Sequence, residues 1–409
     1  MDIDYHYFVV KTLACKAGFA EEDAQTIAYY SQQVDDFVKC SPMRVRQEPP
    51  DFFVRNGYAV KSIGGTWQMV PHPTGIDVVQ SVNDAYRRAT LAAFHFIPDK
   101  PLSEIETKPG FTRADYRCVR ADDMRAVLIN RIIDDAVREV QEQKSEKSLM
   151  QLGMALHTYA DTYAHCGYSG LEGWENHAVI KKAYNQQTKK EEVPAGERLV
   201  YSELPHIGHG NAGHVPDICT YQIDVAMKRD ERDEVYEQHI VRDNLEEFLN
   251  CAKVILKYLA GAAKTDACEN IVWDELRVQL AEAMQMPTAG ETNEHKLIQH
   301  WKKVFPEIAY VYDKTERFYS REDMTLMSYD EAGSEMTNMS SCEAVENLTD
   351  VLDMDASAEN VLSSIRIYHV TDAFYMYNEL AYRRAQTVLG TEEPLMHNIQ
   401  MLAEGQYEG

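Results

Sequence analysis

The sequence predicts a mostly α-helical protein with a small inserted hairpin and a helical C-terminal extension. The main observation is that apolar residues recur three and four positions apart over long stretches, which is the spacing of one helix face. These stretches are residues 24–34, 77–94, 121–143, 149–165, 242–263, 274–286 and 357–390. With 409 residues, 44% of them hydrophobic, the chain can bury a large core in one domain or two.

Two stretches depart from the helical pattern. Residues 52–70 are rich in Val, Tyr and Trp and contain Gly57 and two glycines at 64–65, which favours a hairpin inserted between helices. Residues 182–198 carry Lys and Gln runs. We expect this polar stretch to form an exposed loop.

The helix expected at 149–165 holds the strongest functional signal. His157, Asp161 and His165 stand four residues apart, so a helix stacks their side chains along one face. Zinc and similar cations prefer imidazole and carboxylate ligands, and successive helical turns bring such groups close enough to share an ion or bridge two. The alternative is that the two histidines pack or hydrogen-bond in the core, beside a solvated aspartate.

Other candidate ligands lie elsewhere within residues 1–220. They are Asp4, His6, Asp35, Asp36, His95, His209, His214 and Asp217. The last three lie in a segment rich in glycine and proline, whose flexible backbone lets side chains converge. Each also has a simpler interpretation, since His95 suits a core position and the acidic pair at 35–36 suits a solvated helix end. Together they supply enough donors for two or three zinc ions, with another divalent metal as the alternative.

The acidic composition limits the substrates and partners. The formal net charge of −25 repels polyanions, and binding to a phosphate backbone normally depends on clustered Lys and Arg. Long nucleic acid is therefore disfavoured. Bound dications would offset charge where carboxylates gather, so a small or zwitterionic phosphoester, such as a phospholipid head group, remains compatible.

Several sequence features are absent, and their absence bears on the location of the protein and on other possible chemistries. No stretch approaches the ~20 apolar residues of a membrane span, and the opening residues lack the basic and apolar regions of a secretory signal. Eight cysteines without a Cys-x-x-Cys pair favour a reducing compartment. We expect a cytoplasmic protein, and export by a dedicated secretion system stays open. Phosphate-loop, Gly-x-Ser-x-Gly and His-Glu-x-x-His motifs are absent from the sequence.

The order of these residues resembles the superfamily of zinc-dependent phospholipases C and single-strand-specific nucleases. The segments at residues 3–7, 31–36, 94–96 and 157–170 are most similar to an uncharacterised bacterial branch of it, and the similarity covers residues 1 to 220. The resemblance implies a helical phospholipase C-like or nuclease-like fold with three zinc ions.

Carried over by motif, the resemblance assigns a role to most of the candidates. His6 matches the N-terminal ligand histidine, and either Asp35 or Asp36 matches the first aspartate. Asp161 matches the carboxylate that bridges two ions. The other implied ligands are His95, His157, His165, His214 and the closing acid Asp217.

The chain departs from the superfamily at two places. Secreted members bind zinc through the amine of an N-terminal tryptophan, whereas this chain has no tryptophan before Trp67. Asp4 is expected to replace that ligand, or the third ion is absent. The closing motif is one residue shorter than usual and contains Pro216, which makes His214 a stronger candidate than Asp217 and leaves His209 as a competing ligand.

The sequence therefore predicts a metal-dependent phosphoric ester hydrolase, phospholipase C-like or nuclease-like. Asp161 would position a water activated by the ions, and Asp35 or Asp36 would accept its proton. A soft boundary near 225 would separate a hydrolase-like core, 1–225, from a helical region, 226–409, that packs on it. The alternative is a non-catalytic, metal-stabilised binding or toxin-like interaction protein. The oligomeric state stays open.

Overall fold

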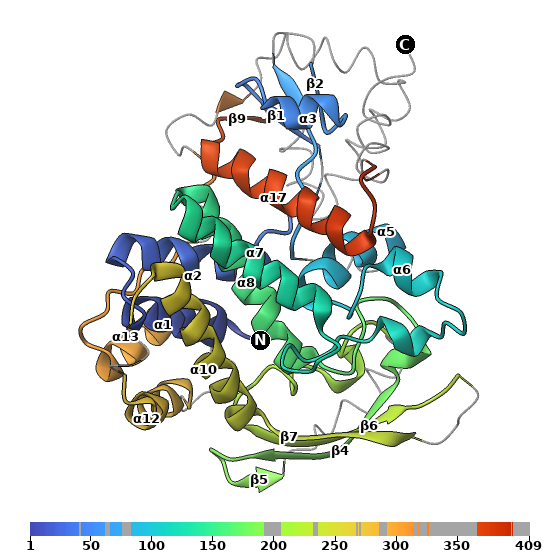
Figure 1. Ribbon diagram of the computed structural model, residues 1–409, viewed down its shortest axis with the longest axis vertical. Helices are drawn as coiled ribbons and strands as arrows, with labels where there is room; N and C mark the ends of the chain where they lie inside the picture. Colours follow the sequence, from blue (N-terminus) through green and yellow to red (C-terminus); the bar gives the residue numbers. More distant parts are fainter. Residues whose placement is uncertain are drawn as a thin grey trace. The chain divides into compact units, whose positions relative to one another are not determined.

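The computed structural model describes most of the chain, and it combines helices with two β-sheets (Figure 1). The described residues are 1–40, 42–61, 66–75, 83–191, 206–231, 236–266, 269, 271–285, 293–313, 317–319, 325–326, 366–393 and 395. The prediction of a mostly α-helical, phospholipase C-like fold with one hairpin was therefore wrong. It failed because amphipathic strands were assigned to loops and helices.

Contacts between residues divide the chain into two compact units. The first comprises Met1–Phe37, Thr74–Tyr312 and Thr387–Thr391, and the second comprises Val38–Pro73, Asp313–Gln386 and Glu392–Gly409. All candidate ligands belong to the first unit. Position 225, suggested as a boundary, lies inside a strand of that unit.

Helix α8 (Glu146–His165) is the centre of the first unit. Its residues from Leu149 to His165 are buried apart from Gln151, as expected of a helix covered on all faces. Helices α2 (Glu21–Asp36), α7 (Val127–Glu142) and α10 (Asn244–Ala263) contact it. The expected helices at 24–34, 121–143 and 149–165 correspond to α2, α7 and α8.

Helices α2 and α8 approach each other closely at Gly153. A Cβ atom on Gly153 would lie 2.4 Å from the carbonyl oxygen of Ile27, so a larger residue requires the helices to separate. This approach brings the C-terminal end of α2, which carries Asp35, alongside the middle of α8.

Two π-helices carry further candidate ligands into the first unit. η1 (Asp4–Val9) contains His6 and leads into α1 (Val10–Lys16), whereas η3 (Arg87–His95) ends at His95. The short helix α5 (Asp84–Tyr86) precedes η3, and residues 77–82 of the expected helix lie outside the described residues. Irregular helical turns of this kind are frequent at functional sites.

The first unit also holds a four-stranded antiparallel sheet. Its order is β5 (Lys190–Glu191), β4 (Ala178–Asn185), β6 (Tyr221–Lys228) and β7 (Tyr236–Asp243). The expectation of a loop at 182–198 was wrong for residues 182–185 and 190–191, which form strands. In β6, Ile223, Val225 and Met227 are buried at alternate positions, as on the covered face of a strand, and Ala226 on the opposite face is buried as well.

The second unit contains a five-stranded sheet and α17 (Asp372–Leu389), whose last residues belong to the first unit. The strand order is β2 (Ala59–Lys61), β3 (Trp67–Met69), β1 (Met43–Val45), β9 (Arg366–Tyr368) and β8 (Thr325–Leu326). β2 and β3 pair as the expected hairpin, but residues 52–55 of that stretch form the helix α3 (Asp51–Arg55), and residues 62–65 lie outside the described residues. The helix expected at 357–390 was wrong for β9, which pairs in parallel with β1.

The remaining described elements are short or peripheral. They are α6 (Leu102–Glu106), η4 (Arg113–Tyr116), η5 (Trp174–Asn176), η6 (Gly210–Ala212), α12 (Trp273–Met284) and α13 (Glu294–Val304). Among the helices of the described residues, none is long and apolar enough to cross a membrane.

Candidate metal centre

Asp161, fully buried in the middle of α8, is the residue on which the candidate ligands converge. Its Oδ2 lies 3.1 Å from His95 Nδ1 and 3.2 Å from His157 Nε2. Its Oδ1 lies 3.1 Å from His6 Nε2 and 2.7 Å from the amino group of Met1. The two oxygens of one carboxylate therefore face two different groups of nitrogen atoms, which is the arrangement of a carboxylate able to bridge two cations.

The first donor group combines His95, His157 and Asp161 with Asp35 at the end of α2. His157 Nε2 lies 3.2 Å from His95 Nδ1. Asp35 Oδ1 lies 3.7 Å from His95 Nδ1 and 3.6 Å from His157 Nε2. Bonds of about 2.0–2.2 Å to a tetrahedral zinc ion separate its ligand atoms by about 3.3–3.6 Å. The donor spacing in this group is close to that of a four-coordinate site.

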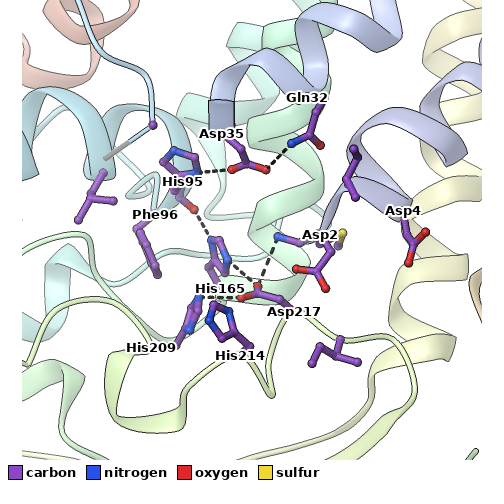
Figure 2. A pocket seen from close by; sticks show the side chains of 15 residues that line it. Asp2, Asp4, Gln32, Asp35, His95, Phe96, His165, His209, His214 and Asp217 are labelled. Atoms are coloured by element: carbon purple, nitrogen blue, oxygen red, sulfur yellow. Dashed lines mark hydrogen bonds and ion pairs between the residues drawn. The ribbon is translucent and has the colours of Figure 1, made fainter. Parts of the chain in front are cut away.

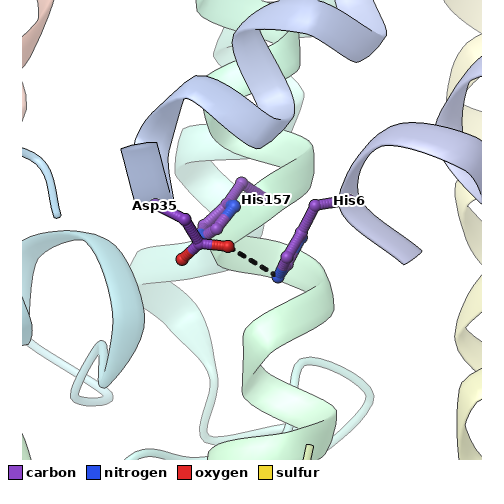
Figure 3. A group of neighbouring side chains, drawn as sticks. All are labelled: His6, Asp35 and His157. Atoms are coloured by element: carbon purple, nitrogen blue, oxygen red, sulfur yellow. Dashed lines mark ion pairs between the residues drawn. The ribbon is translucent and has the colours of Figure 1, made fainter. Parts of the chain in front are cut away.

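A second donor group overlaps the first and contains His6, Asp35 and His157 (Figure 3). His6 Nε2 lies 4.0 Å from Asp35 Oδ2, and the His6 ring stacks on that of His157 with 3.8 Å between centroids. The Met1 amine adds a nitrogen on the same side of Asp161. The two groups share Asp35 and His157. Because His157 has one nitrogen free, its Nδ1 being bonded to Ser31 O, it could bind a single cation, and only the carboxylates could serve two neighbouring positions.

The third donor group contains His165, His209 and Asp217 (Figure 2). Asp217 Oδ1 lies 2.9 Å from His165 Nε2, and Asp217 Oδ2 lies 3.1 Å from His209 Nε2. The Met1 amine lies 3.3 Å from Asp217 Oδ1, so it stands between this carboxylate and that of Asp161. His165 comes from the last turn of α8, whereas the other two come from the loop before β6.

Main-chain carbonyl groups fix the orientation of four of these imidazole rings. His157 Nδ1 bonds to Ser31 O at 2.8 Å, and His95 Nε2 bonds to Thr74 O at 2.8 Å. His165 Nδ1 bonds to His95 O at 2.7 Å, and His209 Nδ1 bonds to Gly213 O at 2.7 Å. Because a carbonyl oxygen only accepts, each of these nitrogens carries the proton. The second nitrogen of each ring faces the carboxylates. It then carries either a lone pair that is available to a metal or a second proton.

The charges within the cluster strongly perturb its pKa values. Burial raises the pKa of Asp161, but nearby histidines and the Met1 amine outweigh burial and lower it well below its ordinary value. Burial also raises the pKa of Asp217, but the nearby charges, chiefly that of His209, outweigh burial and lower it. Burial raises the pKa of Asp35. Asp161 and Asp217 are therefore held as anions that require cationic neighbours.

Two of the histidines have lowered pKa values and two have raised ones, although each carboxylate faces one histidine of either kind. Burial lowers the pKa of His6 well below its ordinary value and also lowers that of His165. Burial opposes protonation of His95 and His209, but Asp161 and Asp217 respectively outweigh it and raise their pKa values. The neighbouring carboxylates thus favour the protonated forms of the latter two histidines, against the effect of burial.

A cavity of about 640 Å³ opens onto the donor groups. Among its lining residues are Asp35, His95, His165, His209 and Asp217, joined by Gln32 and the apolar side chains of Leu91, Phe96 and Ile218 (Figure 2). Its volume is in the range of small-molecule sites. Burial raises the pKa of Asp2 to about 7, as it does for Asp4, and both residues lie on the wall. The ligand candidates on the cavity wall are thus accessible to a small molecule, whereas His6, His157 and Asp161 are fully buried and are not among the lining residues.

The structure brings most of the sequence candidates together and separates three of them. The residues in the donor groups are His6, Asp35, His95, His157, Asp161, His165, His209 and Asp217. Asp36 instead accepts a hydrogen bond from the Tyr312 hydroxyl, and Asp4 accepts one from Trp301 Nε1 at 3.3 Å. His214 lines the cavity with an exposed side chain but belongs to none of the donor groups found among the described residues.

The Met1 amine is the participant that sequence reasoning missed. The superfamily pattern includes an N-terminal amine, but the absence of the expected tryptophan directed attention to Asp4 instead. The carbonyl groups that orient the histidines were also missed, because every residue has a carbonyl and no sequence signal distinguishes them.

Comparison with known proteins identifies a family without assigning an activity. Residues 1–389 match a family described as "Family of unknown function (DUF6765)", and the chain belongs to that family. No curated protein and no solved structure matches the chain. The resemblance to phospholipases C and nucleases is a prediction from the motifs alone.

Proposed function

We propose that this DUF6765 protein is a metal-dependent phosphoric ester hydrolase, a phospholipase C-like phosphodiesterase that uses two or three zinc ions. One observation carries the proposal: four histidines place one ring nitrogen against a main-chain carbonyl and turn the other toward a carboxylate. Metal-binding histidines characteristically show this arrangement, in which the carbonyl fixes the tautomer and the ring direction.

A metal explains this arrangement better than hydrogen bonds alone. His95 Nδ1 and His157 Nε2 lie 3.2 Å apart, and both face Asp161 Oδ2. Because the other nitrogen of each ring is already protonated, hydrogen bonds from both rings to Asp161 would require two adjacent imidazolium rings. A single imidazolium at His95 would leave the lone pair of His157 Nε2 facing the carboxylate. A dication placed among the three atoms satisfies all of them with neutral rings. The donor types, two nitrogens and carboxylate oxygens, suit zinc.

The proposed chemistry is hydrolysis at phosphorus. Bound divalent ions lower the pKa of a water molecule toward neutrality and neutralise charge on a phosphoryl group. Asp161 fixes the relative position of the two adjacent donor groups through its two oxygens. Asp35, with 32% of its side chain exposed and a place on the cavity wall, is the acid suited to accept a proton from water. Asp36 is directed at Tyr312 and is not assigned this role.

The substrate that suits the site is a compact phosphoester. The cavity accommodates a small molecule, and the chain carries a net charge of −25 that repels long polyanions. A single phosphodiester, by contrast, presents its charge directly to the ions. We therefore propose a small phosphodiester or a phospholipid head group rather than long nucleic acid.

A chelation and reconstitution experiment tests the proposal. The protein is treated with a chelator, reloaded with zinc, and assayed on bis(p-nitrophenyl) phosphate. We expect hydrolysis only after reloading, loss of hydrolysis in Asp161→Asn, and near-normal hydrolysis in the control Asp36→Asn. Full metal loading without turnover of this ester, a phosphocholine ester or single-stranded DNA would favour the alternative, a non-catalytic metal-stabilised binding protein.

A further inference from the structure

The third donor group is held in place by two residues that follow it in sequence. Arg242 lies near the end of β7 and Asn244 is the first residue of α10. The guanidinium of Arg242 donates to the carbonyl oxygens of Tyr163 and of Ala164, the latter at 2.7 Å. It also donates to the carbonyl oxygen of Pro216 at 3.0 Å.

Asn244 completes the connection from the other side of the loop. Its Nδ2 lies 2.9 Å from the carbonyl oxygen of Val215 and 2.9 Å from that of Ile218. Its Oδ1 accepts a hydrogen bond of 2.8 Å from Arg242 Nε, so the two side chains form one unit. Asn244 is completely buried.

Three of these five carbonyl groups belong to immediate neighbours of two candidate ligands, and the other two lie two positions away. Ala164 precedes His165 at the end of α8, and Pro216 and Ile218 flank Asp217. The distance of 2.9 Å between His165 Nε2 and Asp217 Oδ1 therefore spans two chain segments that the same pair of side chains connects. We infer that Arg242 and Asn244 are positioning residues that hold His165 and Asp217 at metal-binding distance.

The chemistry of the bonds suits this role. The last carbonyls of a helix lack partners within the helix, and a cation there interacts favourably with the helix dipole. Every hydrogen bond that the structure gives Arg242 goes to a neutral oxygen, so its fork of donors serves to join carbonyls rather than to neutralise one acid. A lysine has a single nitrogen and cannot reach these separate acceptors with the same geometry.

The inference predicts a selective loss of one ion. Arg242 and Asn244 bond to residues beside the third group, whereas His95 and His157 are oriented by Thr74 and Ser31. Weakening the pair should lower the affinity for the ion of the third group and spare the ion between His95 and His157. Outer residues of a metal site typically change affinity by about 10- to 100-fold.

The inference rests on the metal binding of the proposed function, but not on hydrolysis. The test is a cobalt titration of the full chain, followed by visible absorption and by metal analysis, for wild type, Arg242→Lys and Asn244→Ala. His209→Ala provides the reference for a defective third group. Arg120→Lys is the matched control, because Arg120 pairs with Asp122 and Glu247 instead of loop carbonyls.

We expect both test variants to lose affinity for one ion by about tenfold or more, with the same spectral change as His209→Ala, while Arg120→Lys binds like wild type. Excess cobalt should restore the missing band, which an unfolded variant would not show. Wild-type titration curves in both variants, or equal weakening of every ion, would overturn the inference. Normal cobalt binding without phosphoester turnover would reject the proposed hydrolase and leave the positioning role intact.

Discussion

The amino group of Met1 lies 2.7 Å from Asp161 Oδ1, although 160 positions separate the two residues in the chain. The amine is buried, and it lies 3.3 Å from Asp217 as well. The Met1 amine therefore contacts Asp161, on which the first two donor groups converge, and also Asp217 of the third donor group. As an amine it can serve as a metal ligand, and as an ammonium it can replace part of the charge of a metal.

Adding residues before Met1 should impair metal binding. An extension converts the amine to an amide, which removes its charge and its lone pair. It also places additional residues at a buried position of the cluster. We expect a protein with a cleavable N-terminal tag to bind fewer ions than the same protein after cleavage at Met1. Metal analysis before and after cleavage provides its own control. Equal metal content in the two forms would show that the amine is dispensable.

The metal-free protein should lose stability at alkaline pH. Burial lowers the pKa of the Met1 amine, but Asp161, Asp217 and Asp35 outweigh burial and raise it from 8.0 to about 11. Because the pKa is higher in the folded protein, the protonated amine contributes its full stabilisation at pH values below 8.0, the pKa in the unfolded chain. This contribution is lost as the pH rises through about 11. Thermal unfolding of chelator-treated protein at a series of pH values measures the loss. The N-terminally tagged form, which has no amine at this position, should lack that part of the pH dependence.

Removing the central ligands should reduce both metal content and thermal stability. We expect His157→Ala and Asp161→Ala to lose metal, because each contributes to the group around Asp161 Oδ2. Metal present at about 1,000 times its dissociation constant stabilises the native state by about 4 kcal/mol. Calorimetry with and without chelator measures this difference. Asp36→Ala is the matched control, and unchanged metal in the first two variants would mean that the histidines only pack.

Substrate preference should depend on salt. The acidic surface repels single-stranded nucleic acid more than a small chromogenic phosphodiester, so the small ester should be hydrolysed faster at low salt. At physiological ionic strength, salt screens charges over about 8–10 Å. The difference between the two hydrolysis rates should therefore become smaller as salt is added. Parallel rate measurements at increasing salt test this expectation. Faster cleavage of nucleic acid at low salt would contradict the charge argument and favour the nuclease side of the resemblance.

The sequence predicted the central helices, and it singled out the candidate ligands that they carry, because both signals are local. The spacing of His157, Asp161 and His165 defines one helix face, and α8 places all of them in the core. The apolar periodicity of residues 24–34 likewise corresponds to α2, which delivers Asp35. A pattern contained within one helix needs no knowledge of distant partners.

The features that were missed depend on distant parts of the chain. The strands β4, β6 and β7 are stable only when paired with one another, and their charged residues were assigned to a loop and to helices. Only folding decides between Asp35 and Asp36, because adjacent residues of a helix point in different directions. It also decides between His209 and His214, because they lie in a loop whose path has no local signal. Arg242 lies beyond the boundary suggested at 225, yet its hydrogen bonds end beside His165 and Asp217.

The metal content of the purified protein is the decisive measurement for metal binding at this cluster. Elemental analysis, without metal added during purification, should find two or three zinc-like ions per chain, which chelation removes and added zinc restores. Fewer than one ion per chain, with none gained on adding zinc or another divalent metal, would contradict the account.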